Sequence, residues 1–248
     1  MNQIFLGKLY GALEGATVRE LQGLHDFFGK YHVWDWVSAE HTKTLFWLRS
    51  QPDGEYNAKQ ISAAISVVGP KGQLWPEPVM IPRIISGLNQ LKLVRVTWAK
   101  TGLREIQPFH LELNALRGET GGPLWDRFGE VILSASYKEI SALAQLYSQT
   151  DLMNQPGFYL PTLCWLGSAP ADRVKFSEFQ EKSEEIKRQV RSSHDMRNVT
   201  NGIWWAFQKK LIFIEQGIDD FRLDTSPLCS LGFETNQTNK GGKHEQIQ

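Results

Sequence analysis

The chain has 248 residues, enough for one large domain or two small ones, and 41% are hydrophobic and 22% charged, as in ordinary globular proteins. Its 27 Lys and Arg residues balance 27 Asp and Glu residues. This balance excludes a protein that holds bulk DNA or RNA by charge alone, because phosphate-driven binding needs an excess of cations. It favours a protein partner, or nucleic acid that other proteins already hold.

Two features of the chain bear on its compartment. The only cysteines, Cys164 and Cys229, lie far apart in the sequence and fit neither a disulfide framework nor a metal site. No stretch reaches 18 uninterrupted apolar residues, and residues 1–15 contain no apolar core of signal-peptide length. We therefore expect a cytoplasmic protein with reduced thiols, no membrane span, no metal and no cofactor.

Four helices are predicted from their first residues. Thr17 to Glu20 forms a capping-box pattern that is followed by apolar residues at helical spacing. Asn57 to Gln60 starts a second helix, and Ser136 to Glu139 is another capping-box pattern. Ser177 opens the longest predicted helix, which runs to about His194. Its glutamates come early and its lysines and arginines late, an order that complements the helix dipole.

Strands are predicted between these helices from aromatic content and from alternation of apolar and polar residues. The predicted strands are His32–Trp36, Thr44–Arg49, Leu91–Trp98, Phe109–Leu113, Val131–Leu133, Ile203–Phe207, Leu211–Ile214 and Phe221–Leu223. The last two are expected to pair across the acidic turn at 217–220. Asn201-Gly202 is expected to separate the strand at 203–207 from the preceding helix, with continuation of that helix as the alternative.

Helices and strands follow one another without a regular βαβ alternation, which favours an α+β fold over a doubly wound parallel sheet. We predict a mixed, mainly antiparallel sheet with several packed helices in a single domain, residues 1–233. The polar stretches at 150–157 and 167–173 are too short to be clear linkers. Residues 234–248 are polar and contain glycines, which predicts a disordered tail. No repeat with the period of a solenoid or propeller is visible.

The sequence contains no strong catalytic or metal-binding motif. The glycine-bearing segment from Gly118 to Gly122 lacks both the P-loop lysine and the Rossmann spacing, so a plain loop is the better interpretation. No two of the six histidines are four residues apart, as metal-binding pairs on a helix would be. Cys164 lies in an apolar segment, where its pKa would be raised and its reactivity lowered.

The segment from Arg188 to Lys210 is the most unusual part of the chain, with five cations, one histidine and a Trp-Trp-Ala-Phe run. The Arg188/His194 spacing resembles the Arg/His motif of ribonucleases of the higher-eukaryote-and-prokaryote nucleotide-binding superfamily. There the histidine would act as acid or base and the arginine would stabilise phosphate charge. Six residues on a helix turn a side chain about 120° away from its starting face, which argues against this role. Arg191 and His194 share a face, but their spacing is too short for the motif.

A binding role explains the same segment better. From Lys182 to Lys210, seven Lys and Arg stand against three Asp and Glu, a local net charge of +4. Cations for phosphates beside aromatic faces for bases are what single-stranded RNA binding requires. The predicted RNA-binding residues are Arg188, Arg191, Arg197, Lys209, Lys210, Trp204 and Trp205. The alternative is that these aromatics belong to the core and the cations form a solvated helix face.

Two regions resemble a known family in their layout. Residues 21–49 (LQGLHDFFGKYHVWDWVSAEHTKTLFWLR) have the pattern of a helix followed by strands. Residues 211–234 (LIFIEQGIDDFRLDTSPLCSLGFE) have that of a strand, an acidic turn, a second strand and a short leucine-bearing end. This layout is similar to that of a small accessory subunit of type III CRISPR effector complexes of the D subtype. The resemblance implies a non-catalytic subunit of an RNA-guided ribonucleoprotein in antiviral defence. Its neighbours would be the large polymerase-like subunit, the backbone subunits and the guide RNA.

The excess of aromatic residues fits such a subunit, because Trp, Tyr and Phe are enriched at protein interfaces. The residues expected at an interface with neighbouring subunits are Trp34, Trp36, Trp47 and Trp75. Two alternatives remain open. One is a metal-independent ribonuclease that uses Arg188 or Arg191 with His194, and the other is a stand-alone protein-binding module with no role in nucleic-acid binding.

Overall fold

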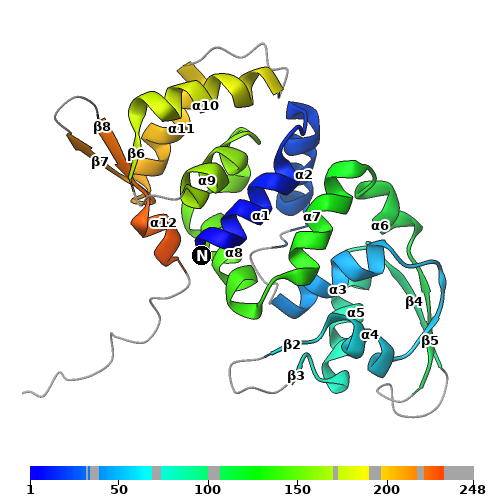
Figure 1. Cartoon of the computed structure of the whole chain (residues 1–248). Coiled ribbons are helices and arrows are strands. Elements are labelled where there is room, and N and C mark those ends of the chain that lie inside the picture. Colours follow the sequence, from blue (N-terminus) through cyan, green and yellow to red (C-terminus); the bar gives the residue numbers. More distant parts are fainter. Residues whose placement is uncertain are drawn as a thin grey trace, which may run out of the picture.

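The computed structural model describes residues 1–31, 33, 39–68, 74–99, 107–169, 173–189, 197–216 and 221–231 (Figure 1). The α-helices of these residues are α1 (Gln3–Leu13), α2 (Val18–Lys30), α3 (Ala39–Arg49), α4 (Ala58–Ile65), α5 (Ile81–Gln90), α6 (Asn114–Glu119), α7 (Pro123–Ser134), α8 (Tyr137–Thr150), α9 (Tyr159–Ser168), α10 (Phe176–Gln189), α11 (Arg197–Gln208) and α12 (Ser226–Ser230). Short 3-10 turns lie at η1 (Pro78–Met80) and η2 (Leu152–Asn154).

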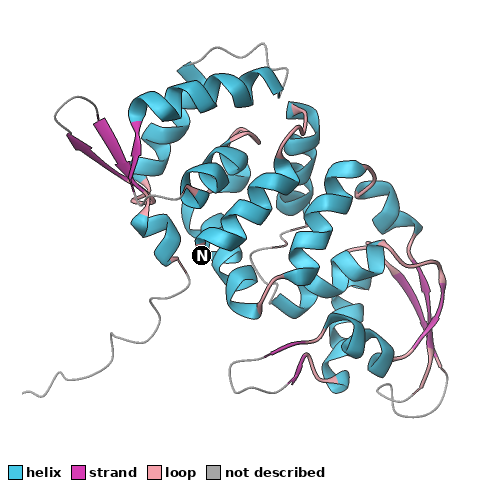
Figure 2. Cartoon of the chain, in the orientation of Figure 1, coloured by secondary structure: helices cyan, strands magenta, loops and turns pink. Residues whose placement is uncertain are grey.

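The strands form three small sheets, and every pairing among the described residues is antiparallel. Strands β1 (Gly54–Tyr56), β4 (Arg95–Trp98) and β5 (Phe109–Glu112) form a sheet of order β1-β5-β4. Strands β6 (Arg173–Lys175), β7 (Phe213–Gln216) and β8 (Phe221–Asp224) form one of order β6-β8-β7, and β2 (Val67–Val68) pairs with β3 (Leu74–Trp75). The two larger sheets lie at opposite ends of the molecule with helices between them (Figure 2). The predicted class, α+β with mainly antiparallel strands and several packed helices, is confirmed.

Three of the four predicted helix starts, at Thr17, Asn57 and Ser136, rest on a local hydrogen bond, and α10 begins at Phe176, one residue before the predicted Ser177. The Thr17 side chain accepts from the amide of Glu20, whose carboxylate accepts from the Thr17 amide in return, so the capping box is complete. Ser136 and Glu139 form the same reciprocal pair at the start of α8. The longest predicted helix is α10, which is described as far as residue 189; the remainder of the prediction, to His194, lies outside the described residues.

Three predicted strands are wrong, because each of them is part of a helix. Residues 44–49 belong to α3, which is buried on most sides and therefore shows no clear polar face in the sequence. Residues 131–133 belong to α7, where Leu124, Phe128 and Ile132 are buried at intervals of four residues. Residues 203–207 belong to α11, and Asn201-Gly202 lies inside that helix. Apolar runs this short do not by themselves distinguish a buried helix from a strand.

The remaining strand predictions are correct in type and shifted in position. Residues 109–112 form β5, with alternate side chains buried, and β7 and β8 pair antiparallel as expected, while residues 217–220 lie outside the described part. Within the predicted strand Leu91–Trp98, only Arg95–Trp98 is extended, and β7 begins at Phe213 rather than Leu211. The predicted strand His32–Trp36 lies almost wholly outside the described residues.

The two three-stranded sheets belong to two copies of one arrangement. The first runs α3, β1, α4, α5, β4, β5, with the β2-β3 hairpin and η1 inserted between α4 and α5, and the second runs α9, β6, α10, α11, β7, β8. In both copies the last strand lies between the other two. Apart from the insertion, a helix, a strand, two further helices and a β-hairpin follow one another as in a winged helix-turn-helix. We call residues 39–112 the first winged unit and residues 159–224 the second winged unit; helices α1, α2, α7 and α8 lie between them (Figure 1).

The turn that leads from the last helix of each unit into its hairpin is the same in both. Lys92 and Lys210 have left-handed backbone conformations, with φ values of 62° and 57°. The amide that follows this lysine donates to the carbonyl four residues before the lysine, at 3.1 Å in the first unit and 2.9 Å in the second. This is a Schellman motif, in which a residue with positive φ ends the helix. A shift of 118 residues, from Lys92 to Lys210, therefore aligns α5 and β4 with α11 and β7.

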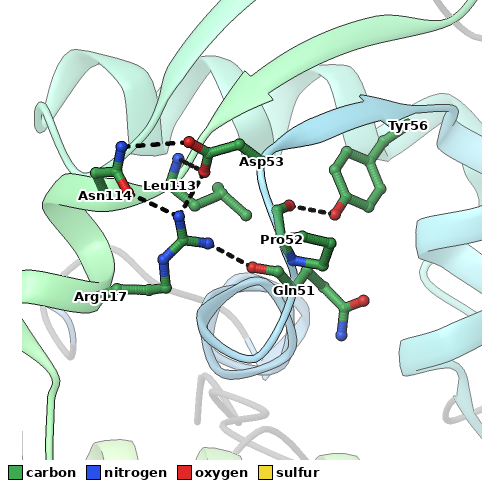
Figure 3. A network of polar contacts seen from close by, with 7 residues as sticks. All are labelled: Gln51, Pro52, Asp53, Tyr56, Leu113, Asn114 and Arg117. Carbon is green, nitrogen blue, oxygen red and sulfur yellow. Dashed lines mark hydrogen bonds and ion pairs between the residues drawn. The ribbon is translucent and has the colours of Figure 1, made fainter.

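A polar network ties the start of the first winged unit's sheet to α6 (Figure 3). The Asp53 carboxylate accepts from the amide of Leu113 at 2.8 Å, from Arg117 Nη2 at 2.7 Å and from Asn114 Nδ2 at 3.2 Å. Arg117 also donates to the Gln51 carbonyl at 2.6 Å. The Leu113 amide and the Arg117 guanidinium hold the pKa of Asp53 below its usual value. This network joins the turn before β1 to the helix after β5, so its role is structural.

Candidate nucleic-acid interface

Helix α11, the last helix of the second winged unit, carries the Trp-rich run. Asn201, Trp204 and Gln208 are exposed and three or four residues apart, so they share one face of the helix. Trp204 is 55% exposed, and its ring stacks on Phe207 with centroids 5.3 Å apart and planes at 26°. This face therefore offers a flat aromatic surface between two amide side chains.

The opposite face of α11 packs on α9. Trp205 is 9% exposed, and its ring centroid lies 5.5 Å from that of Tyr159. A Cβ atom at Gly202 would lie 3.0 Å from the same tyrosine ring, so the glycine allows close packing of the two helices and does not end α11. Of the two tryptophans predicted to bind RNA, only Trp204 presents its ring to solvent.

The predicted cations surround this helix in the sequence, and the structure places some of them. Lys209 and Lys210 are exposed in the turn after α11. Arg188 lies in the last turn of α10 and Arg197 begins α11, with both side chains outside the described part. Arg191 and His194 lie outside the described residues, so the Arg/His pair of the ribonuclease alternative is not placed.

The sheet of the second winged unit adds further exposed groups. Lys175 on β6 and Arg222 on β8 are cross-strand neighbours, and both are exposed. Phe213 and Phe221 are 47% and 52% exposed. Together with Trp204 they make up three of the five large hydrophobic side chains that are exposed among the described residues. Among the residues whose side chains are described, the exposed aromatic surface is therefore concentrated in the second winged unit.

Helix α5 occupies the corresponding place in the first winged unit, and its exposed face is polar. Its buried side consists of Ile81, Pro82, Ile84, Ile85 and Leu88. On the other side, Arg83 and Gln90 are exposed and Ser86 is half-buried. Arginine and amide side chains form paired hydrogen bonds with base edges, and arginine also binds phosphate.

The two winged units differ in charge. The first contains nine Lys and Arg against six Asp and Glu, whereas the second contains ten of each. Helix α4 carries an exposed lysine, Lys59, and no acidic residue. Helix α10, its counterpart, carries four glutamates, which line a depression of about 770 Å³ together with Trp165 of α9 and Lys182: Glu178, Glu181, Glu184 and Glu185.

The tryptophans predicted for protein contact are placed only in part. Trp47 on α3 is half-buried, with its ring edge-on to Tyr56 and centroids 5.9 Å apart. Trp75 lies in β3, but its side chain is outside the described part of the chain. Trp34 and Trp36 lie wholly outside the described residues. Their role at an interface stays a prediction.

Two side chains with possible chemistry are buried in the core. Burial raises the pKa of the Cys164 thiol far above its usual value. Burial lowers the pKa of His25 to about 4, and its Nε2 lies 3.5 Å from the Tyr147 hydroxyl. Within the described ranges, no cluster of three or more His, Cys, Asp or Glu residues is placed to hold a metal. Neither Cys164 nor His25 is open to a substrate.

No family model, no curated protein and no solved structure matches this chain. Of the helices in the described part of the chain, none is long and apolar enough to cross a membrane. The winged units and their exposed side chains are therefore the basis for assigning a function.

No sequence motif singles out Arg83, Ser86 or Gln90. The signal that identifies them is the amphipathic spacing of α5 itself, with apolar residues at 81, 84, 85 and 88 and polar residues opposite. The helix gains its significance from its place after α4 and before a β-hairpin, which the sequence does not reveal on its own.

Proposed function

We propose that this protein is a non-catalytic nucleic-acid-binding protein whose first winged unit docks on duplex DNA through α5. The observation that carries the proposal is the exposed polar face of α5, at the place of the second helix of a helix-turn-helix. In such proteins this helix lies in the major groove and the first helix crosses the backbone. The shared topology is an analogy with such proteins and does not by itself establish DNA binding. The chemistry comes from Arg83 and Gln90, whose donors and acceptors match base edges and phosphates.

The surroundings of α5 support the same ligand. Lys59 and Gln60 are exposed on α4, the helix that would cross the DNA backbone. The first winged unit has a net charge of +3, nine cations against six anions, although the whole chain is neutral. A net positive charge on one unit favours local phosphate contacts without making the protein a general polyanion binder.

The double variant Arg83→Ala/Gln90→Ala is expected to bind a labelled DNA duplex of mixed sequence at least about thirtyfold more weakly than the wild type. The reason is the loss of one cationic and one amide contact, each worth about 1–3 kcal/mol when well formed. Removal of one phosphate contact should also lower the slope of log K against log salt by about 1. Fluorescence anisotropy at several salt concentrations measures both quantities.

A matched control lies on α8, where Lys138 and Gln149 are both exposed. The variant Lys138→Ala/Gln149→Ala removes the same charge and the same amide far from α5, so it should bind like the wild type. Equal losses in the two double variants would show that only net charge matters. That outcome, or a wild-type protein that binds no duplex, would contradict the proposal.

A second candidate is a non-catalytic subunit of an RNA-guided CRISPR ribonucleoprotein, as the resemblance to accessory subunits of D-subtype type III effector complexes implies. The exposed Trp204 ring beside Lys209 and Lys210 favours this candidate, because it combines a stacking surface with phosphate-binding cations. In this role neighbouring subunits would hold most of the RNA, and the protein would dock on them through aromatic side chains.

Native purification separates this candidate from a free DNA-binding protein. A ribonucleoprotein subunit is expected to elute in large assemblies that contain RNA and shrink on ribonuclease treatment. Triple substitution of Arg188, Arg191 and Arg197 by alanine should weaken RNA association and flatten its salt dependence. Elution only as a 28.3 kDa chain free of RNA would rule this candidate out.

A further inference from the structure

The 118-residue shift between the winged units allows their surfaces to be compared position by position. Ser86 on α5 corresponds to Trp204 on α11, and Arg95 at the start of β4 corresponds to Phe213 at the start of β7. Arg95 is exposed and lies 3.6 Å from Glu112, whereas Phe213 is 47% exposed. At equivalent positions, the first unit thus carries polar groups and the second carries aromatic rings.

The two units also differ in the charge of the preceding helix, which is α4 before α5 and α10 before α11. A duplex that enters a helix-turn-helix runs its backbone across the first helix. In the first winged unit that helix is α4, with an exposed Lys59 and no acidic side chain. In the second it is α10, where Glu178 and Glu181 are exposed and Glu184 and Glu185 are half-buried. Four glutamates against Lys182, Lys187 and Arg188 leave α10 with a net charge of −1, so α10 is less suited than α4 to the backbone of a duplex.

The second unit nevertheless has what a single strand needs. The exposed Trp204 ring stacks on the half-buried Phe207 ring on α11. Lys209 and Lys210 follow directly in the exposed turn after α11. Unpaired bases stack on exposed aromatic rings whatever their sequence, while nearby cations hold the phosphates. A single strand along α11 need not cross α10.

We infer that the second winged unit binds unpaired nucleotides on the Trp204 ring, so that the whole protein prefers a duplex that carries a single-stranded extension. The preference for a junction rests on the proposed function of the first unit, which supplies the duplex contact. The binding of unpaired nucleotides by the second unit stands independently of it.

The test compares a labelled blunt DNA duplex with the same duplex carrying an oligo(dT) extension of about ten nucleotides, a length that covers one binding site. The wild-type protein is expected to bind the extended duplex at least about fivefold more tightly than the blunt one. Trp204→Ala should remove this gain, and Trp204→Phe, which keeps a stacking ring, should retain most of it. Arg83→Ala/Gln90→Ala should weaken binding of both DNAs and preserve their ratio.

The possible outcomes separate the two units. Tight binding of the extended DNA with none of the blunt duplex would support the second unit's role and remove the duplex proposal. Equal affinity for the two DNAs would overturn the inference. A Trp204→Ala variant that loses affinity for both DNAs alike would also overturn it. So would a Trp204→Ala variant that keeps the gain and instead releases a co-purified protein, because the ring would then belong to a protein interface.

Discussion

Truncation of Phe28 to alanine is expected to lower the free energy of unfolding by about 3–5 kcal/mol. Phe28 lies on α2 and is fully buried. Its ring centroid is 6.1 Å from Trp125, 5.9 Å from Phe128 and 5.5 Å from Tyr147. Removing the ring leaves a cavity among other rings that cannot collapse to fill it. Urea unfolding followed by tryptophan fluorescence measures the change.

Phe221→Ala is the matched control, since it removes the same ring from a position that is 52% exposed on β8. A change within about 0.5 kcal/mol is expected there, as for surface substitutions in general. Losses of similar size at both positions would mean that Phe221 is covered in solution, and that the second winged unit exposes less aromatic surface than described.

Acidification from pH 6.5 to pH 4 is expected to destabilise the protein by about 3 kcal/mol through His25 alone. Burial lowers the pKa of this histidine from 6.5 to about 4 in the folded state. Between these two values the unfolded chain binds a proton that the folded protein does not bind, so stability falls as the pH falls. Above pH 6.5 both states are neutral at this residue and the effect is absent.

The contribution of His25 is isolated by comparing the pH dependence of unfolding in the wild type and in His25→Gln, which cannot titrate. His41 also has a lowered pKa, caused mainly by burial, and contributes equally to both proteins. Parallel profiles for the wild type and His25→Gln would show that His25 is not buried as a neutral ring.

Local signals in the sequence predict the helix starts of this fold and miss much of what lies between them. Thr17 and Ser136 are recognisable because a capping box is made by residues three apart in the chain. Residues 44–49 and 203–207 are misread as strands because helix or strand is decided there by distant partners. For α11 that partner is Tyr159, whose ring packs on Gly202.

The candidate site was predictable in its composition and not in its geometry. The sequence marks the cations and rings of residues 188–210, but it cannot tell that Trp204 faces solvent while Trp205 faces α9. The face of α5 escapes notice because Arg83 and Gln90 stand alone in an otherwise apolar segment. The relation between the units is hidden because residues 85–93 and 203–211 share only four identities, at 85/203, 90/208, 92/210 and 93/211.

When one polypeptide contains the same fold twice, the surface of each copy is less constrained to keep a given contact. Selection can alter the surface of one repeat while the other keeps its original contact, provided that the residues which hold the turn and the core are retained. A difference as large as Ser86 against Trp204 at equivalent positions then need not abolish the proposed contact of the first unit. Such inherited redundancy allows a new specificity to arise beside an old one, already tethered to it at a fixed distance.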